Sequence, residues 1–202
     1  MDEYESFVEP VQVSIRRKAP VRPKDMDLPD SAHTTLWFDQ GGTTGWAIVS
    51  VWPEAIHLDN YSILRNIAGW SAGEFIGSEG AQTDQMVNLV LAWDGDLASV
   101  GLEDFILRKM LPGRELLSPV RIGARFEDRL YTMKMDALLV PPQLPALAME
   151  TIPDNRLKLW GFWPPLVGLP HARDALKHGL THLKRLKKKN QDEARKAARK
   201  AR

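Results

Sequence analysis

The sequence predicts one α/β domain, in which a meander of three antiparallel strands is followed by alternating helices and strands. A chain of 202 residues with 44% apolar and 26% charged residues has the composition of a soluble globular protein of one domain. A glycine-rich hairpin near residue 40 opens the predicted sheet. The later segments alternate between apolar runs typical of strands and apolar stripes at helical spacing.

The hairpin at residues 35–51 is the stretch around which the domain is organised. A short apolar run ends in Asp39, residues 40–45 form a Gly/Thr-rich turn, and a β-branched run at 46–51 returns. The glycines leave no side chain between Asp39 and an incoming group, so an anion could approach closely. An aspartate in this position is typical of metal-dependent nucleases and of phosphate-binding ATPases. It is equally compatible with a plain hairpin whose aspartate caps its own turn.

Three further strands are expected after this hairpin. Residues 56–64 alternate well enough for a third strand, and the glycine-rich residues 68–80 predict a loop. Residues 99–107 read as a buried strand that contains Glu103, and residues 146–149 as a short fifth strand. A buried carboxylate is costly unless a cation or hydrogen-bond donors satisfy it, so Glu103 is a candidate functional residue unless the strand ends in solvent.

Apolar stripes predict three main helices. The first follows Thr83 as N-cap and covers 83–97, and the second covers 119–135. The last begins at His171, and Asp174 lies three residues later on a neighbouring face. Two such side chains in a first helical turn can point at one metal ion. They could also serve as an N-cap and a surface salt bridge.

The absence of cysteine limits the chemistry. With no thiolates, any metal must be held by oxygen and histidine nitrogen, and oxygen-rich sites favour magnesium or manganese. No apolar run approaches the roughly 20 residues of a membrane span, and the acidic N-terminus is unlike a signal peptide. We therefore expect no membrane partner and a cytoplasmic protein, in the host cytoplasm if a phage encodes it.

Charge is distributed unevenly along the chain. Residues 184–202 carry a net charge of +8, and the rest carries −7. We expect an extended, proline-containing arm at 1–33 that docks on the body or on a second subunit, a folded domain at 34–183, and a basic helical tail at 184–202. The tail is either a solvated end of a helix or a segment that binds a polyanion. Its candidate DNA contacts are Lys184, Arg185, Lys187, Lys188 and Lys189.

The order of these motifs resembles the RuvC-like Holliday-junction resolvases of the ribonuclease H-like nuclease superfamily. The closest resemblance is to the divergent versions carried by bacteriophages of actinobacteria, over roughly residues 35–186. It implies a mixed five-stranded sheet, with an antiparallel meander of strands 1–3 followed by parallel strands 4–5, flanked by helices. The metal-binding or catalytic positions that it implies are Asp39, Glu103, His171 and Asp174.

Two departures from the family pattern concern the first turn and the segment after the fifth strand. The family's usual Asp-Pro-Gly is here Asp39 followed by Gln40 and Gly41, so the turn loses a proline but keeps a glycine. The segment after the fifth strand, often basic in the family, contains acidic residues here. Arg156 and Lys158 are the candidates for holding the DNA backbone near the cleaved bond.

The resemblance implies a metal-dependent endonuclease that resolves four-way junctions or related branched DNA in recombination and repair. It implies two Mg²⁺ ions per site, with Mn²⁺ able to substitute. Asp39 would bridge both ions, Glu103 and Asp174 would each hold one, and His171 would ligate or take a proton from the attacking water. Two symmetric nicks require two active sites, which implies a homodimer.

Three alternatives stay open at the level of sequence. A DNA-binding protein of the same fold could lack catalysis. An actin- or sugar-kinase-like ATPase could use the Gly/Thr turn for phosphate, although such enzymes need a second lobe that this chain is too short to build. A nuclease could also prefer flaps or forks, because branch recognition depends on surface shape and dimer geometry.

Overall fold

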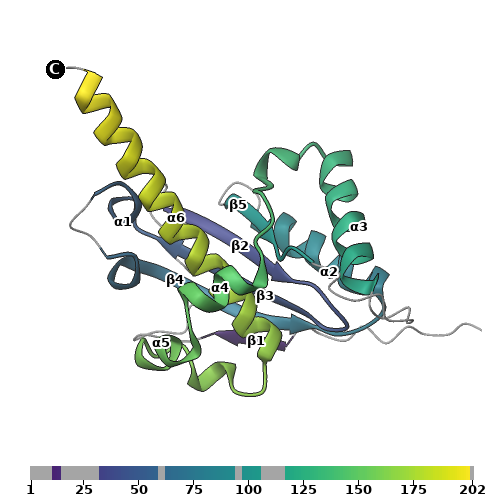
Figure 1. The fold of residues 1–202 in the computed structure, drawn as a ribbon. Helices are drawn as coiled ribbons and strands as arrows, with labels where there is room; N and C mark the ends of the chain where they lie inside the picture. Colours follow the sequence, from purple (N-terminus) through teal and green to yellow (C-terminus); the bar gives the residue numbers. More distant parts are fainter. Residues whose placement is uncertain (1–10, 15–31, 59–61, 94–96, 106–116, 201–202) are drawn as a thin grey trace, which may run out of the picture.

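The computed structural model describes residues 11–14, 32–58, 62–93, 97–105 and 117–200, and places them around one mixed sheet (Figure 1). The strand order is β1-β4-β3-β2-β5, with β2 and β5 parallel and the other neighbours antiparallel. The strands are β1 Val11–Ser14, β2 His33–Asp39, β3 Thr44–Val51, β4 Ile67–Phe75 and β5 Leu97–Leu102.

Helices cover both faces of the sheet, and each face has its own apolar core. On one face α6 crosses the strands diagonally, and α1, α4 and α5 lie beside it, while α2 and α3 cover the other face (Figure 1). The helices are α1 Glu54–His57, α2 Glu79–Ala92, α3 Ser118–Thr132, α4 Pro145–Thr151, α5 Asp154–Leu159 and α6 Pro170–Lys200.

The third strand lies later in the chain than its sequence pattern suggested. The expected strand at 56–64 is wrong, because the described part of this segment holds the end of α1 and the start of a short 3-10 turn, Ile63–Asn66. The expected loop at 68–80 is also wrong, since β4 occupies most of it. Its small residues have low strand propensity, but β3 and β1 pair with it on both sides, and this pairing overrides the local preference.

The predicted fifth strand is wrong as well. Residues 146–149 lie in α4, which Pro145 starts at its first helical position. Beside β5 the chain instead runs extended and forms two isolated parallel bridges, Val100 with Leu139 and Glu103 with Gln143. The predicted set of five strands is therefore not confirmed: four lie in the predicted domain, and the fifth partner in the sheet is β1 from the N-terminal arm.

The two helices on the α2/α3 face bury the stripes that the sequence predicted. Helix α2 starts earlier than expected, because Ser78 rather than Thr83 caps it and accepts from the Ala81 N–H at 3.2 Å. The strand β5 stops at Leu102, and residues 106 and 107 of the expected strand lie outside the described residues. The buried stripe residues are Met86, Val90, Ile122, Phe126 and Leu130, all of which pack in the core.

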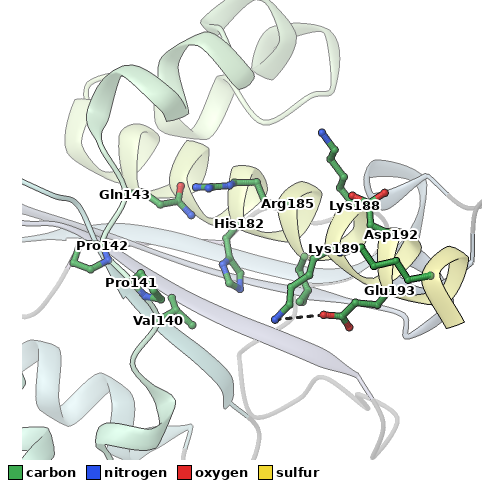
Figure 2. A pocket seen from close by; sticks show the side chains of 12 residues that line it. Val140, Pro141, Pro142, Gln143, His182, Arg185, Lys188, Lys189, Asp192 and Glu193 are labelled. Atoms are coloured by element: carbon green, nitrogen blue, oxygen red, sulfur yellow. Dashed lines mark ion pairs between the residues drawn. The ribbon is translucent and has the colours of Figure 1, made fainter.

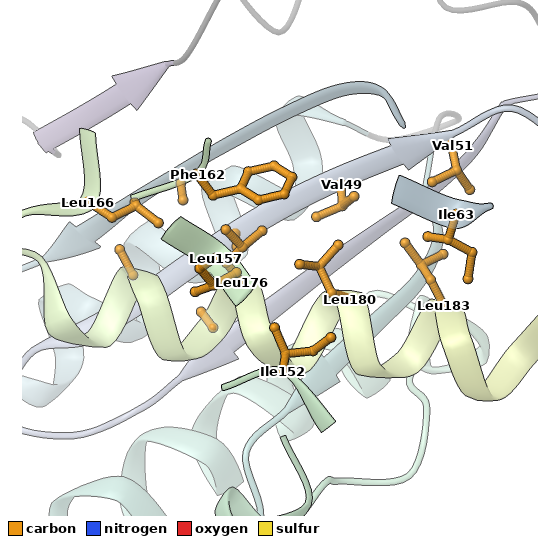
Figure 3. Close-up of a cluster of buried hydrophobic side chains, with 14 of the residues drawn as sticks. Val49, Val51, Ile63, Ile152, Leu157, Phe162, Leu166, Leu176, Leu180 and Leu183 are labelled. Carbon is orange, nitrogen blue, oxygen red and sulfur yellow. The ribbon is translucent and has the colours of Figure 1, made fainter. Parts of the chain in front are cut away.

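The last helix, α6, has 31 residues and runs without a break through position 183, where the folded domain was expected to end. Its first half packs on the sheet, with Leu176, Leu180 and Leu183 against Val49 and Val51 (Figure 3). Its second half extends beyond the sheet (Figure 1). Among the described helices, none is both long and apolar enough to cross a membrane.

Candidate functional site

Two carboxylates meet where the parallel strands β2 and β5 end. Phe38 pairs with Leu102 in the register of these strands, so Asp39 and Glu103 follow at the same edge of the sheet. The Glu103 N–H donates to the Phe38 carbonyl at 2.9 Å. The carboxyl ends of parallel strands are a common location for ligand sites, because side chains from neighbouring strands converge there.

The first turn of α6 lies over this edge and brings His171 to Asp39. Nδ1 of His171 lies 2.9 Å from Oδ2 of Asp39. The approach depends on Gly45, which pairs with Asp39 across the hairpin. A Cβ at Gly45 would lie 2.0 Å from the carbonyl carbon and oxygen of His171, so only glycine allows the helix to come this close.

A third carboxylate, Glu74, holds the start of α6 in place. It is the β4 partner of Gly45 and is 8% exposed. Its Oε1 accepts from the backbone N–H groups of His171 at 2.9 Å and Ala172 at 3.3 Å. The first N–H groups of a helix have no acceptor within the helix, so Glu74 caps the N-terminus of α6. Sequence reasoning missed Glu74 because it placed this segment in a loop. The only sequence signal for its role was that Glu74 is a single acidic residue in a run of small residues.

His178, one helical turn after Asp174, lies beneath the two acids. It is fully buried, its Nε2 lies 3.4 Å from Oε2 of Glu103, and its ring stacks on Trp37 at 5.8 Å between centroids. Four side chains thus form a row in the order His171, Asp39, Glu103 and His178, with the half-exposed His171 at one end and the fully buried His178 at the other. Only the helical spacing of His178 from His171 could have indicated this role.

Burial and the close contact of two acids shift the pKa values in this row. Burial raises the pKa of Asp39 to about 8, the neighbouring Glu103 adds to the rise, and His171 opposes it. Burial alone would raise the pKa of Glu103, but its interactions with His178 and Asp39 outweigh burial and lower that pKa. The bond to Asp39 raises the pKa of His171 against the effect of burial.

Asp174 lies outside this row. Its Oδ1 is 2.8 Å from the Lys177 ammonium, which is also 2.6 Å from Oδ1 of Asp154. The Lys177 side chain is only 4% exposed, so the three groups form a partly buried ion cluster. The structure thus brings Asp39, Glu103 and His171 together and leaves Asp174 beside them, paired with a lysine.

The donor set of the site suits a hard divalent cation. Carboxylate oxygens and an imidazole match the ligand preference of Mg²⁺ and Mn²⁺. Burial is the main cause of the raised pKa of Asp39, and a cation between the two acids would offset that cost. Within the described ranges no three acidic or histidine side chains form a preformed metal site. The residues that would hold a divalent cation are therefore Asp39 and Glu103, with His171 on the solvent-exposed side of Asp39.

The predicted DNA contacts lie on two elements. On α5, Arg156 donates to the Thr151 carbonyl at 3.3 Å, and the Lys158 ammonium lies 4.4 Å from the centre of the Trp163 ring. On α6, Lys187 donates to the Leu58 carbonyl at 2.9 Å. The other basic residues of α6 that were predicted to contact DNA are Lys184, Arg185, Lys188 and Lys189.

Comparisons with known proteins find similarity in structure only. No family model matches the chain, and no curated protein matches its sequence. The solved structure of Thermus thermophilus RuvC in complex with a Holliday junction substrate matches with a TM-score of 0.51 and 11% identity. A second Thermus thermophilus RuvC structure matches with a TM-score of 0.51 and 13% identity, and each match covers 74% of this chain and 92% of the other. The chain therefore has a RuvC-like fold.

Proposed function

We propose that this protein is a metal-dependent endonuclease that cuts four-way junctions or related branched DNA. The observation that carries the proposal is the convergence of Asp39 and Glu103 at the ends of adjacent parallel strands, with His171 of α6 at 2.9 Å from Asp39. The similar fold of a RuvC that was solved with a Holliday junction supports branched DNA as the substrate class. We propose the actinobacteriophage type from the sequence resemblance alone, and cytoplasmic action as a separate part of the proposal.

The side chains of the site have distinct tasks in this proposal. Asp39 and Glu103 would hold the ions, two Mg²⁺ per site with Mn²⁺ able to substitute, and Asp174 would join them after release from Lys177. Divalent ions supply an activated water and neutralise charge on the phosphate in phosphodiester hydrolysis. His171, the most exposed of the row, accepts or donates a proton at Nε2 while Nδ1 stays on Asp39.

Paired cutting of a junction adds a symmetry requirement. Two nicks in strands of like polarity need two sites related by a twofold axis, so we propose a homodimer. Among the predicted DNA contacts we retain Arg156, Lys158, Arg185, Lys188 and Lys189. Lys184, Lys187 and Lys188 border a second surface, beside residues 62–64, but only Lys188 of the three also reaches residues 140–143. We therefore propose the DNA contact for Lys188 and not for Lys184 and Lys187.

The test is cleavage of a labelled synthetic four-way junction beside linear duplex, flap and fork, with Mg²⁺ or Mn²⁺. We expect paired, ligatable nicks confined to branched DNA with the wild type, and loss of cleavage with retained binding in Asp39→Asn. Asp84→Asn, at an exposed pair with Arg129 on the opposite face, is the matched control and should cut normally. Normal nicking by Asp39→Asn would contradict the site assignment.

A non-catalytic DNA-binding protein of the same fold is the second candidate. One observation favours it, which is that Lys177 already neutralises Asp174, as a structural ion cluster would. Binding of branched DNA without cleavage in either metal would support this candidate. Cleavage that disappears in Asp39→Asn would exclude it.

A further inference from the structure

A groove of about 910 Å³ runs along the second half of α6 (Figure 2). One wall is the extended segment at residues 140–143, which lies beside β5. The other wall is the face of α6 that carries His182, Arg185, Lys189 and Lys196. Because the groove is open and elongated, its shape suits a chain that passes through rather than a small enclosed ligand.

The cations of this groove lie in one row. At 100° per residue, positions 185, 189 and 196 of α6 fall within an arc of about 40°, so Arg185, Lys189 and Lys196 share a single helical face. They extend over about 16 Å of helix at 1.5 Å per residue, close to five base-pair steps of one DNA strand. Asp192 and Glu193 also line the groove, and Glu193 pairs with Lys189 at 3.9 Å, an exposed pair that a phosphate can replace.

The inner end of the groove meets the candidate site. Gln143 lines the groove and bridges Glu103 beside β5. It is 4% exposed, and its Oε1 has no hydrogen-bond partner in the described part of the chain. Arg185 extends from α6 toward Gln143 in the groove (Figure 2). A strand that leaves the acids therefore passes the segment of Gln143 and then meets the row of cations.

The opposite face of α6 makes structural contacts instead. Lys187 donates to the Leu58 carbonyl at the end of α1, and Asn190 donates to the Ile56 carbonyl at 3.1 Å. These bonds satisfy carbonyls that the short helix α1 leaves open. On one face of α6 Lys187 bonds to the folded domain, whereas on the other face the basic residues line the groove.

We infer that this groove holds the sugar-phosphate backbone of a DNA arm where the arm leaves the candidate site, through Arg185, Lys189 and Lys196. The inference deepens the proposed function and rests on it. It assigns the DNA contacts to one face of α6, whereas a diffuse basic tail would use all faces equally. Each phosphate contact should contribute a salt-dependent share of binding, since it releases about one condensed cation.

Two charge-matched triple variants test the inference, both built on Asp39→Asn and measured without metal. The groove variant is Arg185→Gln, Lys189→Gln and Lys196→Gln, and the matched variant is Lys184→Gln, Lys187→Gln and Arg195→Gln. We expect the groove variant to bind a four-way junction at least about 50-fold more weakly at 0.1 M salt, with a salt slope smaller by about 2 to 3. The matched variant should stay within about threefold, and melting temperatures confirm that both fold.

The absence of cysteine in the chain allows a second measurement. A photo-crosslinker on Lys189→Cys should label the DNA strand within about five nucleotides of the branch point, and one on Lys187→Cys should not. Equal losses of affinity in both triple variants, or equal crosslinking from both positions, would overturn the groove while leaving the proposed function intact. Groove-dependent binding by a wild type that cuts no branched DNA would instead support the groove and contradict the nuclease.

Discussion

The Cα of Gly45 packs directly against the carbonyl of His171, closer than any other residue type would permit. This contact joins the hairpin to the start of α6, two segments far apart in the chain. It sets the height of the helix above the sheet, and with it the 2.9 Å contact between His171 and Asp39. The glycine at this position therefore matters for its contact with the helix as well as for its turn.

Replacing Gly45 with alanine should disrupt the site. The added methyl group meets backbone atoms, which cannot rotate away, so we expect a loss of at least about 3 kcal/mol, the upper end of typical overpacking. The melting temperature should fall by about 6–12 °C. Gly42→Ala is the matched control in the same turn, since its methyl group would meet nothing within 4 Å. Equal melting temperatures for the two variants would contradict this view of Gly45.

Glu74→Gln separates the charge of the cap from its hydrogen bonds. The amide oxygen can still accept from His171 N–H, but the negative charge that helps to raise the pKa of His171 is lost. We expect a lower His171 pKa, measured by NMR titration of the ring, and a stability loss of about 0.5–1 kcal/mol. Glu74→Ala should lose about 1–2 kcal/mol. An unchanged His171 titration in both variants would show that Glu74 does not act on the site.

The metal-free protein should lose stability as pH rises from about 5 to 8. In this window folded Asp39 keeps a proton that the unfolded chain releases, because its folded pKa of about 8 lies above its ordinary value of 3.8. His171 acts in the same direction, since its raised pKa stabilises the fold at low pH and that share is lost as pH rises through it. Glu103, with a lowered pKa, stabilises the fold above about 4.5, and this share is lost only as the pH falls below that value.

Asp39→Asn should flatten this dependence by up to about 1.4 kcal/mol per pH unit, the value for one proton. Urea unfolding in a chelator at several pH values measures the slope. Added Mg²⁺ should restore stability to the wild type, increasingly so toward pH 8, because the cation competes with the proton on Asp39. Equal slopes in the two proteins would contradict the raised pKa.

Lys177→Met should lower the stability of the metal-free protein and raise its affinity for a divalent metal ion. The ammonium lies between Asp154 and Asp174, so its removal leaves these carboxylates only the longer contacts with Arg173, at 3.8 and 4.0 Å. The metal-free protein should lose less than the roughly 3–5 kcal/mol of a fully buried pair, because water reaches both carboxylates. The same change frees Asp174 for a divalent ion. We expect Mg²⁺ to raise the melting temperature more in Lys177→Met than in the wild type. A smaller rise would show that Asp174 takes no part in binding.

Local patterns predicted the hairpin and the last helix because their signals lie within a few residues. Asp39 and Glu103 could be expected at strand ends, since each interrupts or ends an apolar run. The position of β4 could not be predicted, because its strand conformation comes from pairing with β1 and β3 rather than from its small residues. The small residues at 68–80 are typical of turns, and the strand pairing that makes this segment β4 exists only in the folded sheet.

The partner of Asp174 could not be predicted either. Helical spacing places both His171 and Lys177 within reach of Asp174, and sequence alone does not choose between a metal site and an ion pair. The choice depends on Asp154, which comes from α5 and holds Lys177 from the other side. Gly45 and Glu74 act through contacts with the backbone of α6, which no local pattern reveals.

Helix α6 also has a mechanical consequence. One unbroken helix of 31 residues, about 46 Å long, begins at the histidine of the site and ends beyond the groove. A tilt of about 2° about its first turn would displace its far end by about 1.6 Å, which is close to one residue of helical rise. The geometry of the His171 contact and the direction of a strand in the groove are therefore linked, because one continuous helix carries the residues of both.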